Sequence, residues 1–317
     1  KPELYKRLSR AAKRRRNYQS RSAGYRWAAA AIMVLGAAAL IYGVVSLVCR
    51  GFSGGYLLLC LLAVAVYFAA VMALSIRVDN QSLVDIFWGP GFVLVAVVSF
   101  VASRHAGGDE VRRLVVLALT AIWGLRLGLH IGVRNIGHGQ DPRYTAIMSH
   151  RSGSLAGYVA RKIYGPQAVI LFVVSLPVQF AMYQRSALGV LGALGITVWT
   201  VGFVFEALGD YQLSRFKKDP ANAGLVMDRG LWAWTRHPNY FGDVCVWVGL
   251  WLLALGHPGG LVTVVAPLLM GFFLVRVSGK ALLEKNMRRS RGPAARRINS
   301  STAWSWMVEP GGGTRTT

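Results

Sequence analysis

The stretch RHPNYFGD, residues 236–243, concentrates polar groups at the start of an apolar segment. Pro238 suits the first turn of a helix, because its missing N–H would have no partner there in any case. Asn239 and Asp243 are then four residues apart and share one face of that helix. An amide and a carboxylate so placed can bind a carboxamide or a ribose, while Arg236 and the helix N-terminus favour a phosphate or a carboxylate.

A capped helix start at a membrane interface is the competing interpretation of this stretch. Aromatic anchors at the interface would explain Trp232, Trp234 and Tyr240. They would not explain why Asn239 and Asp243 face the same way. On the chemistry of the residues alone, both interpretations stay open.

Other apolar segments also carry charged or polar residues at helical spacing. These residues form three stripes: Arg126, His130 and Arg134; Glu206, Asp210 and Lys217; Arg276, Lys280 and Glu284. A cation near the end of a span usually reaches the lipid headgroups, but charged residues inside spans normally face a bundle interior or a partner. We therefore expect these cations and carboxylates to pair and to leave surplus positive charge for an anionic ligand. Asp85 and Trp88 lie at the start of a further apolar segment. Pro90 and Gly91 can kink its helix or shift the start of the helix to a later residue.

Composition places these residues in a membrane protein. Hydrophobic residues make up 54% of the 317 and charged residues only 15%, and several apolar runs are long enough to cross a bilayer. The net charge of +23 does not indicate nucleic-acid binding, because Lys and Arg of multi-span proteins collect in cytoplasmic segments. The three cysteines show no metal-ligand spacing, so we expect no metal site.

The apolar segments predict an all-α, polytopic transmembrane helical bundle of about 7–8 spans. We place them at about 27–48, 55–76, 83–103, 114–133, 165–183, 187–208, 241–256 and 260–278. The distribution of Lys and Arg then puts both termini in the cytoplasm, which in a bacterium means an inner-membrane protein. Two cytoplasmic segments, 134–163 and 209–240, contain most of the different kinds of charged and polar aromatic residues. We expect the functional residues there.

Two tails flank the spans in this interpretation. Residues 1–26 form a basic cytoplasmic tail suited to anionic lipids, and the following apolar run is too long for the core of a signal peptide. The transmembrane domain covers 27–290, and 291–317 form a C-terminal tail. Oligomeric state cannot be inferred from these patterns.

The segment GLWAWTRHPNYFGDVCVWVGLWLLAL, preceded by FEALGDYQLSRFKKDPANAGLVMDRG and followed by VSGKALLEKNMRRS, resembles the steroid 5-alpha-reductase superfamily in its uncharacterised bacterial branch. The likeness extends through SLVDIFWGPGF and WGLRLGLHIGVRNIGHGQDPRY, and it is strongest over residues 80–290. The motif RHPNY(F/L)G(D/E) is specific to the superfamily. Sterol C=C reductases and isoprenylcysteine carboxyl methyltransferases carry related versions.

The resemblance implies a helical bundle that holds NADPH at its cytoplasmic side and admits a lipid or sterol-like substrate from the bilayer. By motif position, the implied cofactor contacts are Arg134, Asp210, Lys217, Asn239, Asp243 and Arg276. The stripes and the motif add Arg126, Arg236, Tyr240 and Lys280. For the catalytic pair of an acid and a tyrosine that the family uses, Asp85 is the candidate acid, but the fourth span has Trp123 near the expected place of the tyrosine.

The predicted reaction is reduction of a carbon–carbon double bond conjugated to a carbonyl, with NADPH as the hydride donor. An S-adenosylmethionine-dependent methyltransferase of a membrane-bound substrate is the nearest alternative, but LLEKN has Glu284 followed by Lys285 where such enzymes carry paired acids. A non-enzymatic lipid-binding or assembly protein is a third possibility. The sequence has no GxGxxG loop of the dinucleotide-binding α/β kind.

Overall fold

The structure, a computed structural model, describes residues 54–278 except 136, 138 and 224. Every regular element in this part of the chain is a helix, which confirms the prediction of an all-α polytopic fold. Within the described residues, six helices are long and apolar enough to cross a membrane: Gly55–Arg77, Leu83–Ala102, Glu110–Asn135, Leu155–Ala181, Val190–Lys218 and Pro258–Val275. The segments 1–26, 27–48 and 291–317 lie outside the described residues.

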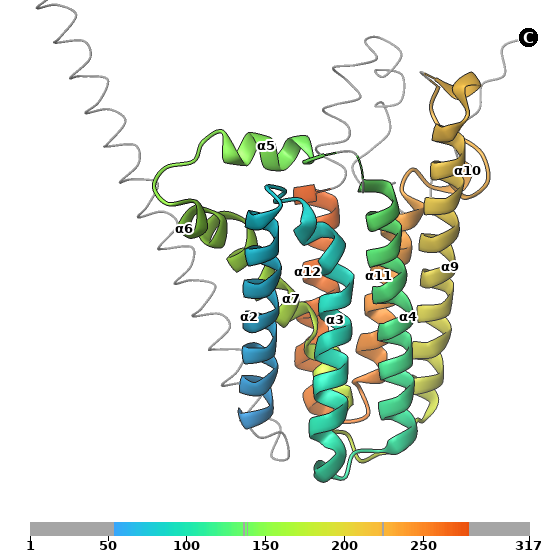
Figure 1. Cartoon of the computed structure of the whole chain (residues 1–317). Coiled ribbons are helices and arrows are strands. Elements are labelled where there is room, and N and C mark those ends of the chain that lie inside the picture. Colours follow the sequence, from blue (N-terminus) through green and yellow to red (C-terminus); the bar gives the residue numbers. More distant parts are fainter. Residues whose placement is uncertain (1–53, 136, 138, 224, 279–317) are drawn as a thin grey trace, which may run out of the picture. The chain divides into compact units, whose positions relative to one another are not determined.

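Four long helices form most of the bundle: α2 (Gly54–Arg77), α3 (Leu83–Ala102), α4 (Glu110–Asn135) and α9 (Val190–Lys218). Figure 1 shows their axes running side by side. The shorter α11 (Pro238–Leu253) packs along α9, and α3 packs on both α2 and α4. Pro238 is in the first turn of α11, as predicted, directly after the N-cap residue His237.

Glycines bring α9 and α11 into close contact. A Cβ atom on Gly202 would lie 2.6 Å from the carbonyl oxygen of Gly242, and a Cβ on Gly242 would lie 2.5 Å from the amide nitrogen of Glu206. Side chains larger than hydrogen therefore do not fit between the two backbones. The close approach brings the polar face of α9 against the first turns of α11.

An aromatic core joins α3, α4 and α11. The rings of Phe92, Trp123 and Trp247 are completely buried. Their centroids are 4.7 Å apart for Phe92 and Trp247, and 5.3 Å apart for the two tryptophans. Packing of this kind fixes the helices rigidly against one another.

The fifth predicted segment, 165–183, begins too late. The helix runs from Leu155 to Ala181 and consists of α6 (Leu155–Val159), the π-helical turn η2 (Ala160–Tyr164), α7 (Gly165–Val174) and α8 (Leu176–Ala181). Ser154 caps its start by accepting a hydrogen bond from the amide of Gly157. Because the wider π turn comes just before Pro166, the helix passes this proline instead of beginning at it.

The segment expected as a loop, 134–163, also contains a helix of its own. This helix, α5 (Pro142–Met148), lies across one end of the bundle (Figure 1). The other short elements are η1 (Ser103–Ala106), η3 (Pro220–Asn222), α10 (Leu231–Trp234), η4 (Pro258–Val264), α12 (Val265–Phe272) and η5 (Phe273–Ser278). α3 begins, α4 and α9 end and α11 begins at the same end of the bundle as α5, and we call it the site end.

Candidate functional site

A buried cluster of charged and polar side chains connects α4, α9 and α11 near the site end. The Nη1 atom of Arg126 donates to Oε1 of Glu206 at 2.7 Å, and its Nη2 donates to Oδ2 of Asp210 at 2.6 Å. The second carboxylate oxygen of Glu206 accepts from the indole N–H of Trp123 at 2.8 Å. The Arg126 side chain is only 19% exposed, and those of Glu206 and Asp210 are 5% and 11% exposed. These ion pairs are therefore largely shielded from water.

Asn239 belongs to this buried cluster but has its side-chain groups occupied. Its amide nitrogen donates to Oδ1 of Asp210 at 3.1 Å, and its amide oxygen accepts from the backbone N–H of Tyr240 at 3.1 Å. The contact with Asp210 links α11 to α9. In this arrangement Asn239 orients its neighbours, and a ligand would have to compete for its hydrogen bonds.

Asp243 differs from the other acids of the buried cluster. Its Oδ1 atom is buried and has no hydrogen-bond partner among the described residues. His130 lies at the edge of the cluster, with Nε2 3.6 Å from Oδ2 of Asp210. An unpaired buried carboxylate oxygen is costly, so Asp243 is well suited to accept a hydrogen bond from a ligand.

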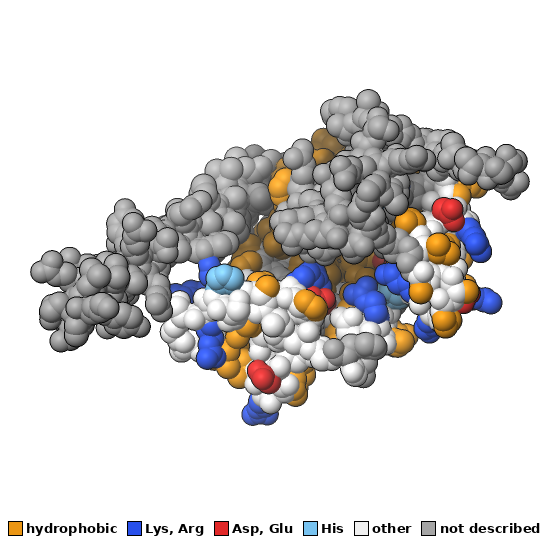
Figure 2. Space-filling model, turned by 90° about the horizontal axis from the view of Figure 1, so that it is seen from above, with side chains coloured by type: hydrophobic (Ala, Val, Ile, Leu, Met, Phe, Trp, Pro, Cys, Tyr) orange, Lys and Arg blue, Asp and Glu red, His pale blue; other side chains and the backbone are white. Residues whose placement is uncertain are grey.

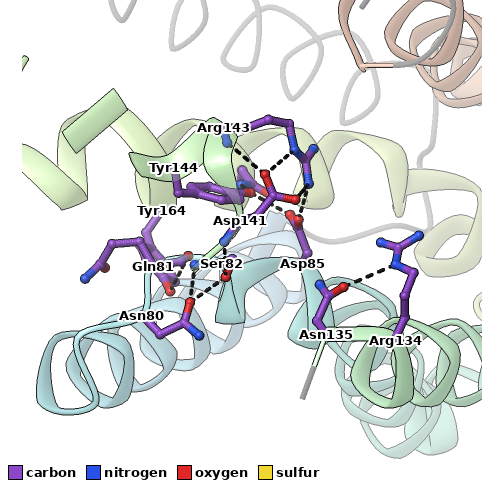
Figure 3. A network of polar contacts seen from close by, with 11 residues as sticks. Asn80, Gln81, Ser82, Asp85, Arg134, Asn135, Asp141, Arg143, Tyr144 and Tyr164 are labelled. Atoms are coloured by element: carbon purple, nitrogen blue, oxygen red, sulfur yellow. Dashed lines mark hydrogen bonds and ion pairs between the residues drawn. The ribbon is translucent and has the colours of Figure 1, made fainter. Parts of the chain in front are cut away.

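A second polar network lies at the site end between α3 and α5, and we call it the helix-end network (Figure 3). Tyr144 donates its hydroxyl proton to Oδ1 of Asp85 at 2.5 Å. Arg143 donates from Nη2 to Oδ2 of Asp85 at 2.7 Å and also binds both carboxylate oxygens of Asp141. Each oxygen of Asp85 thus has its own donor on α5.

Electrostatics in this network keep Tyr144 protonated. Burial raises the pKa of the Tyr144 hydroxyl well above its ordinary value, and the charge and hydrogen bond of Asp85 raise it further. Burial alone would also raise the pKa of Asp141, but the hydrogen bonds and charge of Arg143 bring it below its ordinary value. At neutral pH the network therefore contains a phenol next to carboxylates and a guanidinium.

Further polar contacts hold α5 against the start of α3. The backbone N–H of Gln81 donates to the side chain of Gln140 at 2.9 Å, and the N–H of Asp141 donates to the hydroxyl of Ser82 at 3.3 Å. Asp141 is also the N-cap of α5 and accepts from the backbone N–H of Arg143 at 2.8 Å. The position of Tyr144 therefore depends on how α5 is docked.

Other predicted cofactor residues lie at the rim of the site end or outside the described part of the chain. Arg134, Lys217 and Arg236 are exposed, and Figure 2 shows Lys and Arg side chains gathered on this face. Only the backbone of Arg276 is described, in η5, and Lys280 lies outside the described residues.

The predicted pairing of cations with carboxylates is confirmed in the buried cluster, which itself contains more carboxyl groups than guanidinium groups. Arg126 faces the carboxyl groups of Glu206 and Asp210, with Asp243 nearby on α11. Helical spacing shows which residues share a face, whereas the pairing depends on which helices meet. Positive charge is instead found at the exposed rim.

Sequence patterns missed Arg143 and Tyr144 as partners of Asp85. The signal for a helix was present, since Asp141 followed by Pro142 is a typical N-cap and first-turn pair. It could have predicted α5 but not its contact with a residue 59 positions earlier. His130 was recognised as part of a stripe but not proposed as a site residue.

Comparison with known proteins adds two findings. Residues 71–302 match the family described as "Protein of unknown function (DUF1295)". The chain is also similar to a Delta(14)-sterol reductase of Mus musculus, with 32% identity over 114 residues that cover 32% of this chain and 27% of the relative. The match thus spans about a quarter of the relative's length. No solved structure is significantly similar to the chain. Together the two matches support the resemblance to steroid 5-alpha-reductases at the level of the superfamily.

Proposed function

The chain belongs to the DUF1295 family, and from this premise and the two polar networks we propose that it is a membrane-embedded, NADPH-dependent reductase of a carbon–carbon double bond in a lipid or sterol-like substrate. The similarity to a sterol reductase supports the reaction class. The observation that carries the proposal is the hydrogen bond of Tyr144 to Asp85 at the site end, where α11 also begins. It supplies the acid and tyrosine pair that such a reductase needs.

The residues of the site end fit a nicotinamide dinucleotide. Asp243 has a buried acceptor oxygen without a partner among the described residues, which suits the N–H donors of a carboxamide. The exposed cations Arg134, Lys217 and Arg236 suit phosphate groups. Arg126 and Asn239 would orient the carboxylates behind Asp243 rather than bind the dinucleotide directly. When bound, the dinucleotide would supply a hydride.

Reduction of a conjugated double bond takes up one hydride and one proton. Tyr144 would hold that proton at Oη, since its raised pKa keeps the hydroxyl protonated at neutral pH. Donation from this hydroxyl would stabilise the negative charge that develops on the substrate oxygen. Asp85, which accepts from the phenol at 2.5 Å in the ligand-free protein, would fix the position of the Tyr144 side chain before the substrate binds.

We further propose that the site end faces the cytoplasm of a bacterial cell. Lys and Arg resist translocation, and several of them, including Arg134, Arg143, Lys217 and Arg236, are found at this end. A cytoplasmic site has direct access to NADPH. Antibody or cysteine-labelling accessibility at an exposed rim position such as Arg236 in intact and permeabilised cells would test the orientation.

The test of function is ligand binding followed by turnover. In detergent, NADPH should stabilise the purified protein, by about 2.7 kcal/mol at a concentration of 100 Kd, while S-adenosylmethionine should not. Stabilisation by S-adenosylmethionine alone would favour a methyltransferase and overturn the proposal. With an enone lipid as substrate, Tyr144→Phe should abolish reduction and retain NADPH binding. The matched control is Tyr211→Phe, which removes the hydroxyl of an exposed tyrosine on α9.

A further inference from the structure

Arg143 connects the acidic residues of the helix-end network and is the neighbour of Tyr144 in the chain. It binds Asp85 at 2.7 Å, binds Asp141 with two hydrogen bonds, and precedes Tyr144 in the chain. Its side chain is 43% exposed, whereas Tyr144 is only 6% exposed. Arg143 is thus the part of the network that a ligand arriving from solvent can reach.

The hydroxyl of Tyr144 is fully used in this arrangement. It donates to Asp85 and accepts from the side-chain amide of Gln167 at 3.4 Å. A phenol has one proton to donate, so Tyr144 cannot donate to a substrate while it donates to Asp85. Arg143 favours this state, because its positive charge stabilises the Asp85 carboxylate that accepts the proton.

Glycines lie on both sides of α5. Gly139 precedes α5 and Gly153 follows it, and both have left-handed backbone conformations, with φ of +72° and +80°. A Cβ atom at either position would meet nothing within 4 Å, so these two glycines are not surrounded by side chains, although the Gly139 carbonyl accepts from the side-chain amide of Asn80 at 3.5 Å. The hydrogen bonds and the ion pair that join α5 to the start of α3 can be replaced by water or an anion, whereas the Tyr144 side chain is buried.

Arg134 is a second cation near the exposed face of Arg143. Arg134 lies within electrostatic reach of Asp141, and both Arg134 and Arg143 lie within electrostatic reach of Tyr240 on α11. Figure 3 shows Arg134 at the end of α4, where its Nε donates to the side chain of Asn135 at 3.2 Å, to one side of Asp85. A phosphate bound at this rim would therefore attract Arg143 in competition with Asp85.

We propose that Arg143 is a positioning residue that commits Tyr144 to Asp85 in the ligand-free protein, and that a phosphate group bound at the rim draws Arg143 away and frees the pair. The second half rests on the proposed function, in which the phosphates belong to NADPH. Without the guanidinium, Asp85 can take up a proton from water and donate it to the Tyr144 oxygen, so that the phenol proton of Tyr144 can be donated to substrate only when the dinucleotide is bound. Binding order would then be built into the site.

Hydrogen exchange of the backbone amides of 137–153, followed by mass spectrometry, tests the proposal on the full chain in detergent. Arg143→Gln should speed exchange in α5 by up to about fivefold, the range of a partly exposed ion pair. Arg143→Lys should restore part of the protection, because it keeps the charge. Arg151→Gln should behave as wild type, since this arginine is exposed and its side chain makes no hydrogen bond or ion pair among the described residues. Equal exchange in Arg143→Gln and Arg151→Gln would overturn the proposal.

Added anions test the release step. Inorganic pyrophosphate should speed exchange of α5 in the wild type relative to sodium chloride at equal ionic strength, and should have no further effect in Arg143→Gln. If NADPH stabilises the protein but neither NADPH nor pyrophosphate alters exchange in α5, the release step is wrong and the proposed function stands. If NADPH does not bind but pyrophosphate speeds exchange in α5, the release of Arg143 by phosphate is supported and the proposed function is wrong.

Discussion

Two arginines in this protein each bind two carboxylates, yet their surroundings differ. Arg126 binds Glu206 and Asp210 between long helices, with 19% of its side chain exposed. Arg143 binds Asp85 and Asp141 from the short helix α5, with 43% of its side chain exposed. The same chemical pattern is thus built once into a rigid interior and once into a helix held at the surface.

The difference separates two requirements of a reductase site. The buried cluster lies between α4, α9 and α11, where glycine contacts and aromatic packing fix its geometry. Charges held this way need no reorganisation when a ligand binds. The helix-end network includes the ion pair of the half-exposed Arg143, which water or a ligand can replace. Our proposals therefore assign orientation of the dinucleotide to the buried cluster, and control of the Tyr144 hydroxyl proton to the helix-end network.

The largest expected effect is a difference in the free energy of unfolding between variants of the two arginines. Arg126→Gln leaves Glu206 and Asp210 buried without their cation and should lower the free energy of unfolding by about 3–5 kcal/mol. Arg143→Gln should lower it by less than about 1 kcal/mol, because water screens its partners. Unfolding in detergent at increasing denaturant would measure both. Similar losses in the two variants would show that the networks do not differ in the way described.

Glycine substitutions should show the same division with a smaller effect. Gly242→Ala places a Cβ against the backbone of Glu206 and should cost about 1–3 kcal/mol of global stability, with loss of NADPH binding. Gly139→Ala strains a left-handed residue in open space, so its cost should appear as faster hydrogen exchange in α5. The melting temperature of the second variant should remain close to that of the wild type. A large drop there would mean that α5 is part of the rigid bundle.

Asp243→Asn tests which acid of the buried cluster faces the ligand. The Oδ1 atom has no hydrogen-bond partner among the described residues, so the variant should fold with nearly unchanged stability. NADPH affinity should fall by about tenfold to a hundredfold, the range for one hydrogen bond to a charged group. Asp228→Asn removes an exposed carboxylate and serves as the control. Unchanged affinity in Asp243→Asn would exclude that residue from the site.

Sequence periodicity predicted the parts of this molecule that depend on one helix at a time. The start of α11 at Pro238 and the shared face of Arg126 and His130 follow from local chemistry and from 3.6 residues per turn. Neither rule predicts the contact of Asp85 with Tyr144, two residues on different helices that are 59 positions apart in the sequence. The late predicted start of the fifth span has a similar origin, since only the packed structure shows the π turn before Pro166.

The balance of charge in the buried cluster also depends on tertiary contacts. The stripes on α4 and α9 were visible in the sequence, but their meeting makes Arg126 a partner of carboxylates rather than a ligand for phosphate. The cations expected to bind phosphate are therefore those left at the rim, Arg134, Lys217 and Arg236, whose binding role stays a prediction.

The smallest predicted effect separates the two roles of Asp141, the N-cap of α5 and a partner of Arg143. Asp141→Ala should reduce the stability of α5 docking by about 1 kcal/mol through loss of the cap, plus the contribution of the ion pair. Asp219→Ala is the matched control, because Asp219 is an exposed N-cap that accepts from the backbone N–H of Ala221 and makes no ion pair among the described residues. Hydrogen exchange near each cap would give the two losses.

The pH dependence of α5 protection tests whether the ion pair of Asp141 with Arg143 causes the additional loss in Asp141→Ala. Arg143 lowers the pKa of Asp141 against the opposing effect of burial, so the folded carboxylate binds a proton less readily than the unfolded one. Its stabilisation is therefore complete above the ordinary aspartate pKa of about 4 and is lost as the pH falls through the lowered value. Protection of α5 should decline over this acidic window in the wild type and less in Asp141→Ala. An identical decline in both proteins would assign the titration to Asp85 and leave Asp141 as a cap alone.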